Sequence, residues 1–255
     1  MEKLVVIPTY NERENISKMI SKVMSLEGGY HLLVVDDGSP DGTGAIVKER
    51  QAEFPDRLFL LERSGKLGLG TAYIEGFRWA LARPYDAVFE MDCDFSHNPD
   101  DLLRLTAELE AGADVAVGSR YSKGVTVVNW PMSRLLMSYC ASRYVRIVTG
   151  MPVCDATAGF VGYKREVLAA IDFDRIEMVG YGFQIEMKYT AWKMGFRIGE
   201  VPIIFADRTE GTSKMSGRYL RRSVLRGAGP AVSNDRPEEI TIVALPGSVF
   251  LLCGR

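Results

Sequence analysis

The chain has 255 residues, of which 47% are hydrophobic and 25% charged, and a formal net charge of −2. This composition is typical of one large or two small soluble globular domains, and the charge balance indicates no nucleic-acid partner. No apolar run approaches the roughly 20 residues that a membrane-spanning helix needs, which excludes an integral membrane protein but not a surface-associated one. The four cysteines lack metal-ligand spacing and Met1-Glu2-Lys3 runs directly into an apolar segment, so we expect reduced thiols, no signal peptide and a cytoplasmic chain.

The first 91 residues alternate between apolar runs and segments with helical spacing. The runs are rich in β-branched residues, and the intervening segments repeat apolar residues every three or four positions. Strands are predicted at 3–8, 30–36, 58–61 and 87–91, and helices around 16–23, up to 54 and over 70–82. This alternation predicts an α/β fold whose mostly parallel sheet is covered by helices on both faces.

The second half continues the alternation less regularly. Helices are predicted at 100–111, from 130–134 through Tyr144, and at 182–194, and strands at 114–119 and 196–205. Residues 155–160 read as a loop or the entry to a strand, and 207–217 as a polar, glycine-containing loop.

Polar clusters follow three of the predicted strands. They are Pro8-Tyr10-Glu12, Asp36-Asp37 and Asp92-Asp94. Ligands of open α/β sheets bind beyond the carboxyl ends of the strands, so we expect these clusters to converge on one crevice.

Asp92 and Asp94 are the centre of this expectation. Because side chains alternate along a strand, the two carboxylates would emerge on the same side of its end. Two carboxylates at such a short separation repel each other unless a cation lies between them. Mg²⁺ or Mn²⁺ is the natural cation, because both prefer hard oxygen ligands and bind phosphates. An isolated Asp-x-Asp is also common as a pair of solvated turn residues, so the remaining motifs decide.

The other candidate groups are individually ambiguous. Asp37 could accept from a ribose hydroxyl or a base N–H, or could simply form a turn. The glycine loop 66–70 could face a phosphate or could be an ordinary helix entry. The cations of the second half fit either a phosphate-binding lining or surface ion pairs. These cations are Arg120, Arg134, Arg208 and Lys214. His31 and His97 are interpreted as structural, and no Ser/His/Asp or Cys/His nucleophile arrangement is evident.

Taken together, eight motifs resemble one family. They are PTYNERENI at 8–16, VVDDGSPDGT at 34–43, KLGLGTAY at 66–73, MDCDFSHNP at 91–99, GSRY at 118–121, ATAGF ending at 160, GYGFQIEM at 180–187 and GEVPIIFADRTEGTSK at 199–214. In this order and spacing they resemble the polyprenol-phosphate (dolichyl-phosphate) mannosyltransferases, which are inverting GT-A glycosyltransferases of family 2. The resemblance covers about residues 3–217.

The resemblance implies a GT-A nucleotide-sugar fold and transfer of mannose from GDP-mannose to a polyprenyl or dolichyl phosphate. It implies a site for the nucleotide, for Mg²⁺ or Mn²⁺ and for the acceptor phosphate. The residues implied for the nucleotide are Pro8, Tyr10, Glu12, Val35 and Asp37. Those implied for the metal are Asp92, Asp94 and Ser96, the last at a position where some relatives carry a glutamine. Those implied for the acceptor phosphate are Arg120, Arg134 and Ser138, while Arg208 and Lys214 would close over the donor phosphates. It also implies a peripheral position on the cytoplasmic face of a membrane.

The resemblance ends near residue 217. We therefore expect a transferase domain at 1–217 and an atypical tail at 218–255, which could be a disordered end, a basic membrane-facing patch or a reading-frame artefact. Three other functions compete: a polyprenyl-phosphate glucosyltransferase using UDP-glucose, a sugar nucleotidyltransferase and a non-catalytic binding module. The missing glycine-rich basic signature loop argues against the second. Asp92, Asp94 and the arginines argue against the third.

Overall fold

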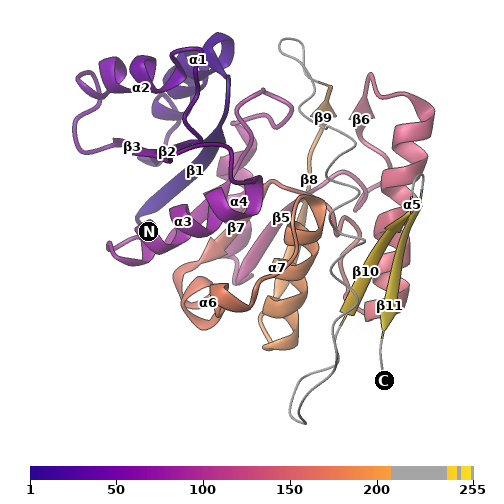
Figure 1. Ribbon diagram of the computed structural model, residues 1–255. Helices are drawn as coiled ribbons and strands as arrows, with labels where there is room; N and C mark the ends of the chain where they lie inside the picture. The colour runs from indigo at the N-terminus through magenta and orange to yellow at the C-terminus, as the bar shows by residue number, and fades with distance from the viewer. Residues whose placement is uncertain (208–239, 246–247, 254–255) are drawn as a thin grey trace.

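The computed structural model describes residues 1–207, 240–245 and 248–253, with side chains described through residue 207 (Figure 1). Seven strands form one sheet in the order β3-β2-β1-β4-β7-β5-β8. Their bounds are β1 Lys3–Thr9, β2 His31–Asp36, β3 Leu58–Glu62, β4 Ala87–Glu90, β5 Val115–Ser119, β7 Val161–Lys164 and β8 Ile198–Pro202. All neighbours are parallel except β7, which runs antiparallel to both β4 and β5. The prediction of a mostly parallel sheet is confirmed.

Helices cover both faces of this sheet, which is why its central strands are almost continuously apolar. One face packs against α1 (Arg13–Met24), α2 (Thr43–Gln51) and α4 (Asp101–Glu110). The other packs against α3 (Leu69–Leu81), α6 (Arg165–Ala170), the single turn η1 (Phe173–Arg175) and α7 (Tyr181–Lys193).

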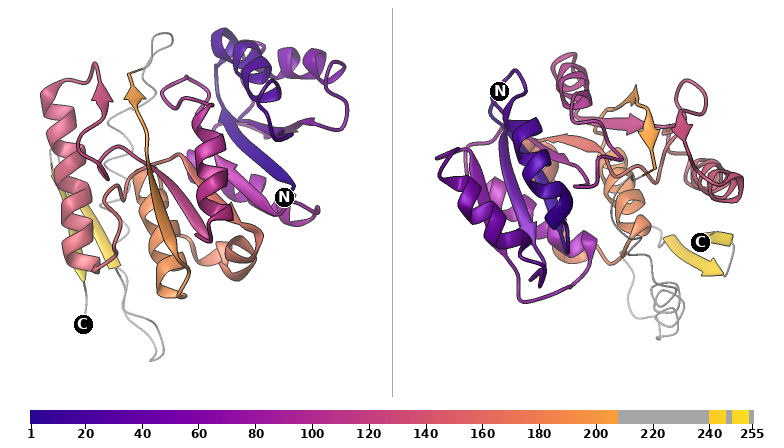
Figure 2. Two further views of the ribbon diagram at one scale, coloured as in Figure 1. Left: turned by 180° about the vertical axis from the view of Figure 1, so that it is seen from behind. Right: turned by 90° about the horizontal axis from the view of Figure 1, so that it is seen from above.

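The remaining elements lie at one side of the molecule, away from α2 (Figure 2). The long helix α5 (Met132–Thr149) buries only Ser142 and Val145. A two-stranded ribbon joins β6 (Val127–Val128) to β9 (Phe205–Ala206), and the backbone hairpin of β10 (Ile240–Leu245) and β11 (Ser248–Cys253) lies beside α5 (Figure 1).

The prediction of one strand over 196–205 is wrong. The run divides into β8 and β9 because β5, the neighbour of β8, ends at Ser119. The Ile203 amide still donates to the Ser119 carbonyl at 3.0 Å, but the ladder offers nothing further, and the chain leaves to pair with β6.

β7 was also missed. It has only four residues, and Gly162 at its centre weakens the strand pattern. The structure explains that glycine: a Cβ at position 162 would lie 2.6 Å from the ring of Phe89 on β4.

Candidate active site at the carboxyl ends of the strands

The loop after β2 is held by Asp36, which the sequence placed in a polar cluster with Asp37 without a separate role. Its carboxylate accepts from the Thr9 hydroxyl on β1 at 2.8 Å and from the Ser39 hydroxyl and amide at 2.6 and 2.9 Å. Asp36 therefore joins the ends of β1 and β2 and fixes the backbone on either side of Asp37.

Asp37 is buried and paired with Arg63, just beyond the end of β3. Nη1 of Arg63 lies 2.7 Å from Oδ1 of Asp37, and the same guanidinium contacts Thr71 and Glu75 on α3. Burial raises the pKa of Asp37, and the charge and hydrogen bond of Arg63 oppose that shift. Sequence reasoning missed Arg63, although its place after a strand at the same sheet edge was a usable signal.

The other predicted nucleotide residues lie at the same edge in different environments. Tyr10 stacks against Lys66, whose Nζ is 4.8 Å from the ring centroid. Glu12 precedes α1, and its carboxylate accepts a hydrogen bond from the side-chain amide of Asn15 at 3.0 Å. Pro8 lies in β1 opposite Val35, whose side chain is fully buried in the core. The side chain of Val35 is therefore not available to a ligand, and its predicted role can involve only its backbone.

Asp92 and Asp94 lie in a loop, not on a strand. Because β4 ends at Glu90, strand alternation does not set the direction of the two side chains. A turn does: Phe95 has φ of 59°, and the Ser96 amide donates to Oδ1 of Asp94 at 3.1 Å. Ser96 is buried and orients Asp94, while its predicted role as a metal ligand stays a prediction.

The donor chemistry of this loop fits a hard divalent ion. The Asp92 side chain is 41% exposed, so a cation can reach it, and both acidic groups supply oxygen ligands. The described residues contain no cluster of three or more His, Cys, Asp or Glu side chains suited to a metal. Two carboxylates suit an ion that takes its other ligands from phosphate and water, as Mg²⁺ does in nucleotide sites.

His97 supports the same loop. Its Nδ1 accepts from the Asp92 amide at 3.3 Å, and its ring stacks on Phe160 and meets Phe205 edge-on. Burial lowers the pKa of His97 to about 4, so the imidazole is neutral near pH 7. The interpretation of His97 as structural agrees with these contacts.

Arg120 is held by a rigid set of hydrogen bonds after β5. Its Nε and Nη2 donate to the two Asp155 oxygens at 2.7 and 2.6 Å, and Nη2 also donates to Thr157 at 2.9 Å. No described residue accepts from Nη1, and the side chain is only 6% exposed. The sequence pointed to Arg120 but not to Asp155, whose partner lies 35 residues away.

Trp130 joins the two predicted acceptor arginines. The guanidinium carbons of Arg134 and Arg120 lie 4.0 and 5.5 Å from centroids of its rings. Phe205 meets Trp130 edge-on and also contacts His97. The rings of Trp130, Phe205 and His97 therefore form a continuous series of contacts between the two arginines and the loop that contains Asp92 and Asp94.

The remaining acceptor residues lie on and beside α5. Ser138 accepts from the Tyr121 hydroxyl at 2.8 Å, and Arg134 donates to Asp207 at 3.2 Å. Arg208 and Lys214 lie outside the described residues.

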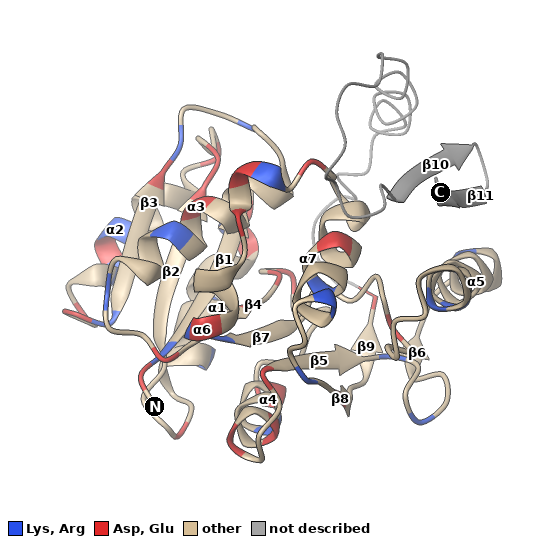
Figure 3. Ribbon diagram, turned by 90° about the horizontal axis from the view of Figure 1, so that it is seen from below, with Lys and Arg blue, Asp and Glu red and all other residues tan. Residues whose placement is uncertain are grey.

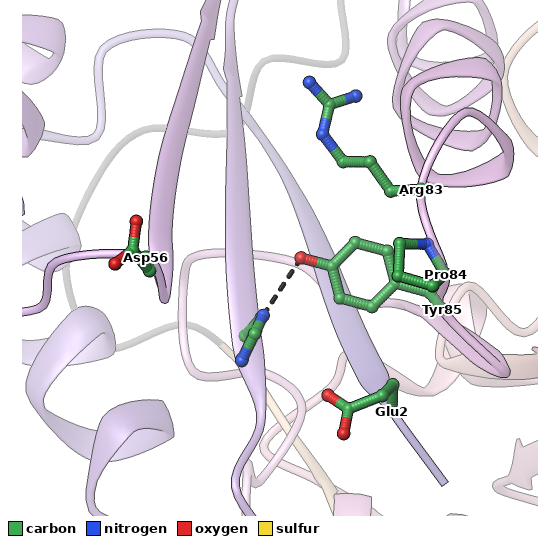
Figure 4. Close-up of a pocket in the computed structure, with 6 residues that line it drawn as sticks. Glu2, Asp56, Arg83, Pro84 and Tyr85 are labelled. Atoms are coloured by element: carbon green, nitrogen blue, oxygen red, sulfur yellow. Dashed lines mark hydrogen bonds between the residues drawn. The ribbon is translucent and has the colours of Figure 1, made fainter.

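A separate cavity of about 230 Å³ lies at the amino ends of the strands (Figure 4). It is lined by Glu2, His31, Asp56, Arg83, Pro84 and Tyr85. His31 and Tyr85 are hydrogen-bonded across it at 3.0 Å, which agrees with a structural His31. This cavity is at the edge of the sheet opposite the site.

Fold and site together define the GT-A class of glycosyltransferases, with a mostly parallel sheet and an Asp-x-Asp loop at its carboxyl edge. The model of the glycosyl transferase family 2 matches residues 4–172, and the chain belongs to this family.

Curated relatives match most of the chain. A polyprenol monophosphomannose synthase of Mycolicibacterium smegmatis is 48% identical over 88% of this chain and 85% of its own length. An undecaprenyl-phosphate mannosyltransferase of Micrococcus luteus is 46% identical over 88% of this chain and 92% of its own. A dolichol-phosphate mannosyltransferase of Pyrococcus furiosus is 34% identical, covering 97% and 69%.

Solved structures share the fold. The mannosyltransferase of Pyrobaculum calidifontis in complex with GDP-Man and Mn²⁺ superposes with a TM-score of 0.54 at 16% identity, covering 88% of this chain and 60% of that one. Glucosyl-3-phosphoglycerate synthase of Mycobacterium tuberculosis in complex with Mn²⁺, UDP and phosphoglyceric acid gives 0.60 at 20% identity, covering 83% and 71%. No helix in the described part of the chain combines the length and hydropathy that a bilayer crossing requires.

Proposed function

We propose that this protein transfers mannose from GDP-mannose to a polyprenyl phosphate with inversion at the anomeric carbon, yielding polyprenyl β-D-mannosyl phosphate and GDP. Three curated relatives with 34–48% identity carry names of this activity class. The dolichyl or other polyprenyl chain of the acceptor would extend away from the sheet edge.

One observation carries the proposal: a continuous chain of aromatic contacts connects the Asp92-Asp94 loop, which we propose to bind the metal, to the arginines that we propose to bind a second phosphate. Arg120 and Arg134 contact Trp130, which meets Phe205, and Phe205 contacts His97 beside Asp92. A transferase that joins a nucleotide sugar to a phosphate acceptor needs both groups within one substrate length.

On the donor side, the nucleotide would lie across the ends of β1 and β2. Asp37 accepts from the base or ribose, and Pro8, Tyr10, Glu12 and the Val35 backbone line the same position. Asp92 and Asp94 would hold Mg²⁺ or Mn²⁺, which neutralises charge on the departing diphosphate. Arg208 and Lys214 are proposed to close over the donor phosphates.

On the acceptor side, no strong general base is needed, because a phosphate monoester is already ionised near pH 7. Nη1 of Arg120 and the guanidinium of Arg134 orient the attacking oxygen and offset its repulsion from the diphosphate, with Ser138 as a further hydrogen-bonding group. Attack from the face opposite the leaving group inverts the anomeric centre.

A lipid acceptor calls for contact with a membrane surface, and α5 supplies suitable chemistry. It contains three arginines and no acidic residue (Figure 3), while Leu136 and Ile147 are 55% and 76% exposed. Exposed apolar side chains beside basic ones are typical of interfacial helices. We propose a peripheral position on the cytoplasmic face.

A donor screen with a polyprenyl phosphate acceptor tests the function by measuring lipid-linked sugar. Transfer from GDP-mannose but not from UDP-glucose is the expected result. Transfer only from UDP-glucose would keep the chemistry and replace the donor. Formation of a nucleotide sugar from a sugar phosphate and a nucleoside triphosphate would identify a nucleotidyltransferase, and donor binding without transfer a binding module.

A further inference from the structure

A buried polar link runs through α7, behind the site. Lys188 and Glu90 are both fully buried, yet neither belongs to the groups assigned above. Nζ of Lys188 donates to the Ala158 carbonyl at 2.7 Å, and Gln184 lies between the two charges, donating to Glu90 at 2.6 Å and accepting from Lys188 at 3.5 Å.

One end of this link lies near the Asp92-Asp94 loop, and the other lies near Arg120. Glu90 is the last residue of β4, two positions before Asp92. Ala158 belongs to the 155–159 turn, in which its amide donates to the Asp155 carbonyl at 3.3 Å. Asp155 in turn binds both Nε and Nη2 of Arg120.

The turn has a second support on its other side. Glu200 on β8 accepts from the amides of Cys154 and Asp155 at 2.9 and 3.1 Å. The 155–159 turn is therefore held at both ends: the Glu200 carboxylate accepts from the backbone at its start, and Lys188 donates to the Ala158 carbonyl near its end.

The cost of burying these groups argues that the arrangement is specific. Burial raises the pKa of Glu90 and lowers that of Lys188, and the opposite charge of each partner opposes the shift. The charge of Lys188 also interacts with Asp155, Arg120 and Glu200. A hydrophobic pair of similar volume is often as stable as a buried ion pair, so stability alone is a weak reason for this one.

We propose that Lys188 is a positioning residue for the acceptor phosphate: through the Ala158 carbonyl it sets the 155–159 turn, and through Asp155 it sets the direction of Arg120. This inference rests on the proposed function for its substrate. It assigns Lys188 no contact with either substrate.

The test separates positioning from stability with a double-mutant cycle. Lys188→Met leaves Glu90 buried without its cation and the Ala158 carbonyl without its donor. Adding Glu90→Gln replaces that buried ionisable group by a neutral amide but leaves the carbonyl unpaired. We expect the double variant to recover thermal stability while the acceptor KM stays raised roughly tenfold, the usual effect of one lost buried hydrogen bond. GDP affinity is expected to stay within twofold of the parent.

Glu90→Gln alone keeps the Lys188 donor, so its acceptor KM is expected to match the parent. Lys164→Met is the matched control, since Lys164 is a partly buried lysine paired with Asp114 at 3.3 Å, on β7. Recovery of both stability and acceptor KM in the double variant would show a purely structural pair and overturn the proposal. Loss of GDP affinity with an unchanged acceptor KM would overturn it equally.

Amide hydrogen exchange keeps this result separate from the proposed function. If the parent transferred no sugar to a polyprenyl phosphate, the proposed function would fail. Faster exchange of the Ala158 amide in the double variant, but not in Lys164→Met, would still support the link from Lys188 to the turn. Unchanged exchange there would overturn the link itself.

Discussion

At the scale of single residues, the site is built from charges whose direction is set by a neighbour. The Ser96 amide orients Asp94, Arg63 holds Asp37, and Asp155 holds Arg120. Each pairing fixes the direction of a charged group that we propose to contact a ligand. Removing the ligand-facing group and removing its support should therefore have different consequences.

Removing either loop carboxylate should abolish turnover without unfolding the protein. Asp92→Ala and Asp94→Ala each remove a carboxylate ligand of the divalent ion, so we expect each variant to lose most of its activity. We expect the same loss when excess EDTA is added to the wild-type protein. Asp100→Ala is the matched control, since Asp100 is a half-exposed carboxylate near the same loop and pairs with Lys22. Full activity of either loop variant, or of the EDTA-treated protein, would contradict the metal assignment.

Asp37 should contribute to donor affinity apart from its pairing with Arg63. Asp37→Ala is expected to weaken GDP binding by roughly 1–3 kcal/mol, the cost of an unmet charged hydrogen bond, as measured by titration calorimetry. It also leaves the buried Arg63 without a main partner, so stability should fall. Asp37→Asn keeps an oxygen acceptor for Arg63 and should weaken GDP binding with a smaller loss of stability. Unchanged GDP affinity in both variants would exclude Asp37 from the nucleotide site.

At the scale of elements, the acceptor half depends on segments that leave the central sheet. The β6–β9 ribbon sets Trp130 against Phe205, and α5 begins two residues after Trp130. Arg134 lies in the first turn of that helix and is about one third exposed, so it can meet a ligand from solvent.

Arg134→Ala should therefore impair the acceptor and spare the donor. We expect a raised KM for polyprenyl phosphate and nearly normal GDP-mannose binding, because Arg134 lies with Trp130 and not beside Asp37. Arg78→Ala removes a half-exposed arginine of α3, outside both proposed substrate sites, and should change neither quantity. Lost donor binding with an unchanged acceptor KM would show that Arg134 belongs to the other substrate.

The elements that could be predicted were those with a local signal. Strands at 3–8, 58–61 and 87–91 end within one residue of β1, β3 and β4, because their apolar runs are continuous and bounded by polar residues. β7 and β9 have four and two residues, and their pairing depends on partners far along the chain. No local pattern identifies such strands.

The same distinction holds within the site. The sequence identifies Asp92, Asp94 and Asp37 as candidates because they are carboxylates that follow predicted strands. Asp155 and Lys188 do not, since their roles come from contacts with Arg120 and Ala158, 35 and 30 residues away. Supporting residues of this kind become visible only when the fold brings them together.

At the scale of the whole molecule, charge and exposure are unevenly distributed. The sheet and its six flanking helices form the main body, and α5 stands at the far side and buries only Ser142 and Val145 (Figure 2). The division into a transferase domain at 1–217 and a tail at 218–255 stays a prediction; the described part of that tail is the β10–β11 hairpin beside α5.

This asymmetry predicts a defined membrane-facing side. Replacing Leu136 and Ile147 together by Glu should reduce sedimentation with anionic vesicles, because each apolar side chain contributes roughly 1.5–3 kcal/mol when buried in the interface. Leu103→Glu introduces one of these two negative charges at a partly exposed leucine of α4, and its binding should equal that of the wild type. Equal sedimentation of all three proteins would exclude α5 as the contact.

The antiparallel strand β7 also constrains the order in which the molecule can assemble during synthesis. Strands β3, β2, β1 and β4 are complete once residue 90 has left the ribosome, and they can pair with one another at once. β5 cannot join them directly, since its place in the sheet is separated from β4 by β7, which is made more than 40 residues later. The 155–159 turn that directs Arg120 lies immediately before β7 in the chain. In a nascent chain the strands up to β4 can therefore pair first, while β5 and the 155–159 turn reach their places in the sheet only once β7 has been made.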